Sequence, residues 1–342
     1  FKSKIFYHLI ALLTIIIWSN TFVSSKILLH NGLSPAEIFA IRFALAYVAI
    51  IPFTHSKLWC DNLKDELLML VLGTTGGALY FLAENTALQY TGVSNVCLLV
   101  CSAPLLTALL ARWFGKSEKM SSRLITGSLI AFAGAALVIV EDWKHMQLKL
   151  LGDMLALCGA LSWAVYQLII KRMCGKYSTV FITRKVFAYG LLTIAVFFVF
   201  DHPSFPLDSM LHPVVAGNLL FLGIIASGLC FWVWNIVIDH LGAVATSAYI
   251  YLQPLFAAIT ASFVLGEPIT GAVVAGAVLI IAGFIGRNIS GTHYIYHAPA
   301  VMPCSMQKRA TGKTQSARAH TNTDKSRKEN RGAKKAFPGR KK

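Results

Sequence analysis

Apolar residues along this chain come in long runs, each about the length of a helix that crosses a bilayer. A membrane span needs roughly 20 mainly apolar residues, whereas a surface helix of a soluble domain carries a polar face. Short polar segments separate the runs. The pattern predicts ten transmembrane helices, near residues 6–28, 35–53, 67–88, 93–114, 124–140, 154–170, 181–200, 214–237, 243–265 and 269–286.

Composition points to the same class of protein. Of the 342 residues, 56% are apolar and 13% are charged, and this charged share is about half that of a soluble domain. The predicted fold class is therefore all-α and integral to the membrane. The seventh span is the weakest of the ten, because Arg184 and Lys185 lie inside it and must either reach the headgroups or face protein.

The positive charge is concentrated after the last predicted span. Residues 297–342 hold 13 of the 31 Lys and Arg, against Asp324 and Glu329. Few apolar residues occur there, so we predict a disordered basic tail. Anionic lipid is a candidate partner for it, although a solvated tail without a partner is the simpler interpretation.

The loops between the predicted spans alternate in charge. Lys and Arg collect in cytoplasmic loops, and with ten spans one set of loops is plainly basic while the opposite set is nearly free of both residues. This predicts that both termini are cytoplasmic. The basic set comprises Lys2, Lys4, Lys57, Lys64, Arg112, Lys116, Lys119, Arg123, Lys171, Arg172 and Lys176.

The two halves of the chain resemble each other. Because each half has five spans, an odd number, the second half must enter the membrane from the opposite face, which is the inverted repeat of many secondary transporters. We predict a first repeat over residues 1–142, an inverted second repeat over 151–290 and the tail over 297–342. Matching positions are Trp18/Trp163, Lys26/Lys171, Asn85/Asn235, Gly92/Gly242, Pro104/Pro254, Ala111/Ala261, Glu118/Glu267, Gly127/Gly276 and Gly134/Gly283.

A pair of prolines and several polar or aromatic side chains are candidates for a binding cavity. Pro104 and Pro254 lie within equivalent spans and should kink each helix beside a central cavity; packing alone is the alternative. Polar and aromatic side chains could line that cavity, or simply join helices and form interfacial belts. The candidates are Trp18, Thr21, Trp163, Tyr166, Asn235, Tyr249 and Gln253.

Two full charges lie within otherwise apolar spans of the first repeat. Arg42 and Glu84 both fall in the outer half of the membrane by residue count. Because an isolated charge is costly there, an ion pair between them with a structural or gating role is the leading hypothesis. The alternative is that Glu84 couples transport to protons.

Motifs of enzymes and cofactor sites are missing from the sequence. No HExxH, GxSxG, P-loop or paired intramembrane Asp occurs, and the cysteines are scattered, so we expect neither an enzyme nor a cofactor or metal site. Stripes of small residues predict close helix packing or a homodimer. They include Gly73, Gly76, Gly77, Gly127, Ala131, Gly134, Ala272, Gly276 and Gly283.

Short motifs spread over both halves of the chain accompany these features. They are Trp18-Ser19-Asn20-Thr21 with Lys26, Pro35 and Arg42, Asn85-Thr86-Ala87-Leu88, Pro104 ahead of Glu118, Gly152-Asp153, Ser162-Trp163-Ala164-Val165-Tyr166, Trp234-Asn235, Leu252-Gln253-Pro254-Leu255 and Leu265-Gly266-Glu267. Together they resemble the EamA-type, ten-span branch of the drug/metabolite transporter superfamily. The resemblance runs from Phe6 to about Arg287. It implies a secondary carrier in the plasma (inner) membrane of a bacterial-type cell, usually an exporter of amino acids, metabolites or drugs, with a cavity between the repeats. An organophosphate or nucleotide-sugar carrier, using Lys26 and Lys171, and a non-transporting scaffold or lipid-processing protein are the alternatives.

Overall fold

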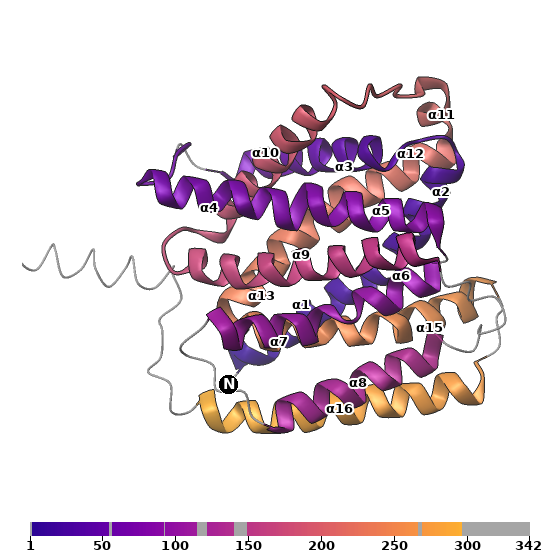
Figure 1. Cartoon of the computed structure of the whole chain (residues 1–342). Helices are drawn as coiled ribbons and strands as arrows, with labels where there is room; N and C mark the ends of the chain where they lie inside the picture. Colours follow the sequence, from indigo (N-terminus) through magenta and orange to yellow (C-terminus); the bar gives the residue numbers. More distant parts are fainter. Residues whose placement is uncertain are drawn as a thin grey trace, which may run out of the picture. The chain divides into compact units, whose positions relative to one another are not determined.

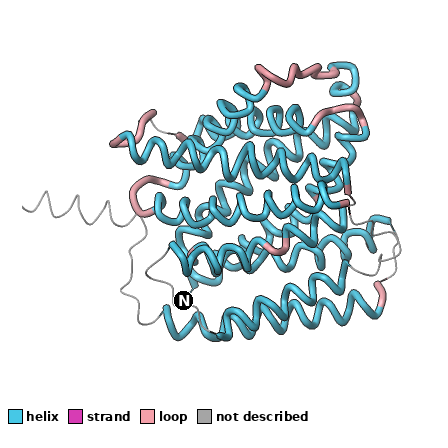
Figure 2. The backbone as a smooth tube through the Cα atoms, viewed as in Figure 1, coloured by secondary structure: helices cyan, strands magenta, loops and turns pink. Residues whose placement is uncertain are grey.

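Every regular element that the computed structural model describes is a helix (Figure 2). The described residues are 2–54, 57–91, 93–114, 122–139, 149–265 and 269–295. Eight helical segments among them are long and apolar enough to cross a membrane, and two shorter apolar helices, Ile125–Val138 and Gly271–Gly286, bring the total to ten. The predicted all-α, ten-span fold is thereby confirmed. The basic tail and the loop residues Glu118 and Glu267 lie outside the described residues.

Helices of the first half form five spans (Figure 1). These are α1 (Lys2–Ser19) with α2 (Thr21–His30); α3 (Pro35–Ile50) with the 3₁₀ turn η1 (Ile51–Phe53); α4 (Leu63–Gly73), η2 (Thr74–Leu79) and α5 (Tyr80–Tyr90); α6 (Val93–Val100) with α7 (Ala103–Phe114); and α8 (Ser122–Ile139).

The second half repeats this order. It comprises α9 (Leu150–Cys174); α10 (Thr179–Phe197); the short loop helix α11 (Leu207–Leu211); α12 (Pro213–Leu220), η4 (Phe221–Leu229) and α13 (Cys230–Leu241); α14 (Ala243–Ser247), η5 (Ala248–Leu252) and α15 (Gln253–Leu265); and α16 (Gly271–Ile295).

Irregular helix segments recur at equivalent places in the two halves. The third and eighth spans each contain a π-helical segment, η2 and η4. The fourth span is interrupted just before Pro104, and the ninth is 3₁₀ just before Pro254. A proline lacks an N–H and its ring crowds the carbonyl four residues earlier, so the same residue interrupts both helices in the same way. The carbonyls four residues before the two prolines belong to Val100 and Ile250, and the Ile250 carbonyl accepts a hydrogen bond from the Gln253 N–H.

Small residues bring α8 and α16 into very close contact, as the sequence predicted. A Cβ added at Gly134 would lie 2.7 Å from the Gly276 carbonyl oxygen, and one added at Gly283 would lie 2.5 Å from the Gly127 carbonyl oxygen. Only glycine allows backbones to approach this closely. The two helices run side by side in Figure 1, so these stripes join the last spans of the two repeats within one chain.

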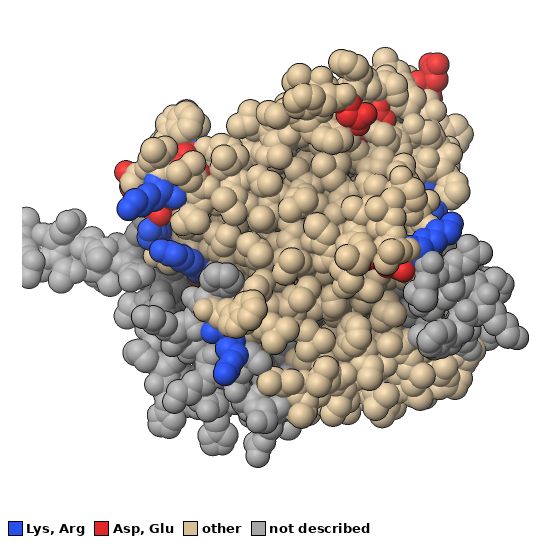
Figure 3. All heavy atoms as spheres, in the orientation of Figure 1, with Lys and Arg blue, Asp and Glu red and all other residues tan. Residues whose placement is uncertain are grey.

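Charged side chains gather at the two ends of the spans. The face drawn in Figure 3 has a broad uncharged band between them. Arg184 and Lys185 face protein: Arg184 donates a hydrogen bond to the Lys57 carbonyl, and Lys185 forms an ion pair with Glu66. Burial of the neighbouring Cys60 thiol and its hydrogen bond to Glu66 raise the pKa of Cys60 to about 12. The seventh span therefore keeps its internal charges by pairing them with the first repeat.

Candidate substrate pocket

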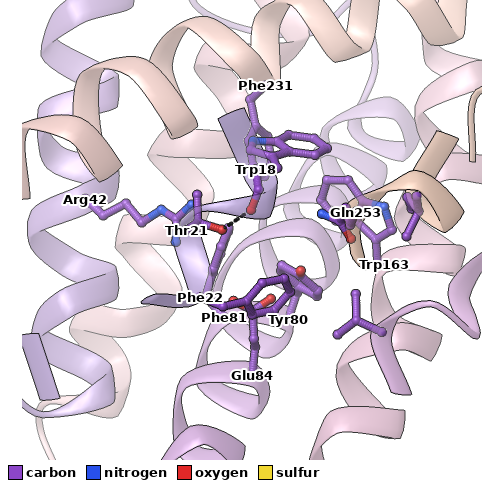
Figure 4. Close-up of a pocket in the computed structure, with 12 residues that line it drawn as sticks. Trp18, Thr21, Phe22, Arg42, Tyr80, Phe81, Glu84, Trp163, Phe231 and Gln253 are labelled. Carbon is purple, nitrogen blue, oxygen red and sulfur yellow. Dashed lines mark hydrogen bonds between the residues drawn. The ribbon is translucent and has the colours of Figure 1, made fainter. Parts of the chain in front are cut away.

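A pocket lies between the two repeats, and side chains from both of them line it. It has a volume of about 410 Å³, including space at its open side. Figure 4 shows Arg42 reaching in from one side, with Gln253 and Trp163 on the other. The lining residues are Trp18, Thr21, Phe22, Arg42, Tyr80, Phe81, Glu84, Val100, Trp163, Phe231, Ile250 and Gln253.

Aromatic rings form much of the pocket wall. Trp18 and Trp163, which occupy equivalent positions in the repeats, meet edge to face with their centroids 5.6 Å apart. Tyr80 packs 5.0 Å from Trp163, and Phe231 contacts both tryptophans. The rings lie well inside the protein, with Trp18 and Trp163 only 7% and 4% exposed. They are therefore not interfacial belt residues.

The π-helical segments help to fix this wall. The Trp18 indole donates a 2.8 Å hydrogen bond to the Ala226 carbonyl in η4, and the Ser162 hydroxyl donates a 2.7 Å bond to the Thr75 carbonyl in η2. Carbonyls of a π-helical segment are freer to accept outside donors than those of a regular helix. The first span of each repeat is thus anchored to the third span of the other.

Arg42 is the pocket's cationic side chain among the residues that the structure describes. It is 2% exposed. Its Nε donates a 2.5 Å hydrogen bond to Ser227 Oγ, and its guanidinium lies 4.1 Å from the centre of the Phe81 ring. One terminal nitrogen, Nη1, has no hydrogen-bond partner.

Glu84 lies in the same pocket but does not form the direct ion pair with Arg42 that the sequence suggested. No nitrogen–oxygen distance of 4.0 Å or less joins the two side chains, both of which are described. The guanidinium instead binds Ser227 of the second repeat and the Phe81 ring. The Glu84 carboxyl interacts with Tyr80, one helical turn earlier.

The sequence candidates divide into two groups in the structure. Trp18, Thr21, Trp163 and Gln253 line the pocket. The other three, Tyr166, Asn235 and Tyr249, are engaged elsewhere: the Tyr166 hydroxyl donates to Asn235 Oδ1 (2.7 Å), Asn235 donates to Thr183 Oγ1 (2.9 Å), and Tyr249 bonds to His8.

Other lining residues have no distinguishing pattern in the sequence. Phe22, Phe81 and Phe231 look the same as lipid-facing aromatics in an apolar run. Tyr80 could have been found, because it lies four residues before Glu84 on the same helix face. Val100 and Ile250 could also have been found, because each lies four residues before a repeat-related proline.

Two lysines proposed for phosphate recognition are not part of this pocket. Lys26 donates to the Leu88 carbonyl near the end of α5, and Lys171 donates to the Asp239 carbonyl (2.5 Å) near the end of α13. The two lysines occupy equivalent positions in the repeats, and each binds a carbonyl near the end of an equivalent helix. Within the described part of the chain, no group of three His, Cys, Asp or Glu could hold a metal ion.

Known proteins resemble this chain over nearly all its spans. The EamA-like transporter family matches residues 5–140 and 150–288. An uncharacterised transporter of Archaeoglobus fulgidus is 28% identical over 81% of this chain and 95% of its own length. A probable amino-acid metabolite efflux pump of Escherichia coli is 25% identical, over 80% and 92% respectively.

A solved crystal structure shares the fold, with a TM-score of 0.65 and 18% identity over 84% of this chain and 98% of the other. The family match falls into two segments that correspond to the two five-span halves described above. With its two halves meeting at a buried pocket, this chain belongs to the EamA-like transporter family and is a membrane transporter rather than an enzyme.

Proposed function

We propose that this protein is a secondary exporter of small metabolites, with amino acids as the first candidates and drugs as the second. The supporting observation is the pocket between the repeats, which combines aromatic walls with one basic and one acidic side chain, Arg42 and Glu84. In carriers with inverted repeats the substrate site lies at the repeat interface near the midplane. The name of the Escherichia coli relative, an amino-acid metabolite efflux pump, points to the same solutes.

The direction and location of transport are part of the same proposal. The basic loops favour cytoplasmic termini, and the family favours the plasma (inner) membrane as the location. Export then means movement from the side of Lys57, Lys64 and Lys176 to the side of α11. The sequence contains no P-loop for ATP hydrolysis. Transport would therefore be driven by a solute or proton gradient.

An organophosphate carrier is the weaker candidate. A phosphate-bearing solute needs several cationic donors at its site, but Lys26 and Lys171 bind helix-end carbonyls. A scaffold or lipid-processing role has no observation of its own in its favour.

Reconstitution of the full chain into proteoliposomes tests the proposal. Vesicles are loaded with radiolabelled amino acids, a cationic drug or a sugar phosphate, and efflux is followed with and without a pH gradient. We expect efflux of one or more amino acids or of the drug above that of empty vesicles. Efflux of the sugar phosphate alone would favour the organophosphate carrier, and no efflux of any solute would contradict the proposal.

A further inference from the structure

We infer that the pocket holds a zwitterion in one orientation, with the ligand carboxylate on Arg42 and its ammonium group toward Glu84 and Gln253. This rests on the proposed function and deepens it, because it assigns a polarity to the site. The starting observation is that a basic and an acidic side chain line one buried pocket with no nitrogen–oxygen distance of 4.0 Å or less between them.

Arg42 has unused capacity to bind an anion. Its side chain is 2% exposed and its Nη1 has no partner, while only Nε is committed to Ser227. A buried charge needs a counter-ion or a full set of hydrogen bonds. The planar guanidinium fork matches a carboxylate, which accepts two parallel hydrogen bonds from it. A ligand carboxylate would complete this set.

Acceptors for an ammonium group stand elsewhere on the wall. Glu84 is 2% exposed and lines the pocket, and Gln253 is 5% exposed with its carbonyl oxygen Oε1 lacking a partner. Figure 4 shows Gln253 across the pocket from Arg42 and Glu84 below both. An ammonium group is donor-only, so it suits these oxygen atoms and would be repelled by Arg42.

The remaining wall of the pocket determines which substituent the ligand can carry besides its carboxylate and its ammonium group. The rings of Trp18, Trp163 and Phe231 line the pocket and pack against one another, and such walls favour an apolar or aromatic substituent. A doubly charged anion would gain contacts at Arg42 and meet repulsion from Glu84. A neutral zwitterion satisfies both charged groups at once.

Binding of three related probes to the purified full chain in lipid nanodiscs tests this orientation. The probes are phenylalanine, phenylalaninamide, which lacks the carboxylate, and 3-phenylpropanoate, which lacks the ammonium group. Isothermal titration should show phenylalanine binding roughly 10- to 100-fold more tightly than either analogue, as expected for lost hydrogen bonds to charged groups. Equal affinity for phenylalanine and its amide would overturn the inference, and this comparison needs no variant.

Two substitutions then test which protein side chain binds each end of the ligand. Arg42→Gln should abolish the preference for phenylalanine over its amide and keep the preference over 3-phenylpropanoate, whereas Glu84→Gln should do the reverse. Lys171→Gln, outside the pocket, is the control and should keep both preferences. An Arg42→Gln protein that folds and still prefers phenylalanine over its amide would contradict the assignment.

Efflux measurements separate this inference from the proposed function. If the binding pattern holds and phenylalanine does not leave loaded proteoliposomes, export of this amino acid is wrong and the orientation stands. If phenylalanine is exported and the amide binds as tightly, export stands and the orientation is wrong.

Discussion

Single side chains at repeat-related positions do the same structural task in both halves. Lys26 and Lys171 each donate to a carbonyl near the end of a neighbouring helix, α5 and α13. A cation there also interacts favourably with the helix dipole. Their equivalence was visible in the sequence, but their partners were not, because a lysine at a span end can equally reach the headgroups or a substrate.

Removing either lysine should therefore affect stability more than binding. We expect Lys26→Met and Lys171→Met each to cost about 1–2 kcal/mol of stability through the lost charged hydrogen bond and dipole interaction. Thermal unfolding in detergent would measure this, alongside pocket-ligand affinity. A loss of ligand binding without a loss of stability would contradict this and would indicate that the lysines bind the substrate.

Cys60 should be an unreactive thiol in the folded protein. Since its pKa is raised to about 12 by burial and by Glu66, it stays protonated at neutral pH, and only the thiolate reacts with maleimide. In a variant that keeps Cys60 alone, alkylation should be at least about tenfold slower than in the denatured chain, and Glu66→Gln should accelerate it. Equal rates in the native and denatured chains would show that the thiol is not protected.

At the scale of the helices, glycines decide where irregular segments can pack. Gly76 in η2 lies against the ring of Tyr166, and Gly223 in η4 lies against Leu45. The sequence predicted the spans and the interruptions at both prolines. It could do so because the length of an apolar run and the effect of a proline depend only on residues close together in the chain. It could not predict η2 and η4, because a π-helical segment depends on which neighbouring side chains donate hydrogen bonds to its carbonyls and which ones pack against its glycines.

Substituting one of these glycines tests that packing. A Cβ at Gly76 would lie 2.1 Å from a Tyr166 ring carbon, whereas one at Gly217 in α12 meets nothing within 4 Å. Gly76→Ala should thus destabilise the protein by about 1–3 kcal/mol, and Gly217→Ala should leave stability unchanged or raise it by up to about 1 kcal/mol, because alanine favours the helix over glycine. Thermal melting curves of the two detergent-solubilised variants give the comparison. Equal curves would mean that the Tyr166 ring can move away from the added methyl group.

For the whole molecule, the inverted repeat explains why the pocket draws on both halves. Trp18 and Trp163 meet in the pocket, and the first span of each half is anchored to the π segment of the other. The repeat and its five-span period were predictable from matching residues alone. The missing Arg42–Glu84 ion pair was not, because the sequence does not show that Ser227, 185 residues away, lies within reach of the guanidinium.

The inverted arrangement also makes a prediction about the two membrane faces. Single cysteines at Asn31 and Asp208 should react with an impermeant maleimide added to intact cells, and one at Lys64 should react only after the cells are opened. All three positions are exposed; Asn31 and Asp208 lie in connecting segments poor in Lys and Arg, and Lys64 lies in the first turn of α4, in a basic segment. Labelling of Lys64→Cys in intact cells would contradict cytoplasmic termini.

The central claim is that the transported solute passes through the pocket between the repeats. A cysteine at Thr21 tests this claim most directly. Thr21 lines the pocket, while Val23 on the same helix is 54% exposed outside it. In a background without other cysteines, Thr21→Cys and Val23→Cys are alkylated in proteoliposomes, and efflux of the transported solute is measured. We predict that alkylation stops efflux only in Thr21→Cys and that excess solute protects this thiol. Unchanged efflux from fully alkylated Thr21→Cys would contradict a transport path through this pocket.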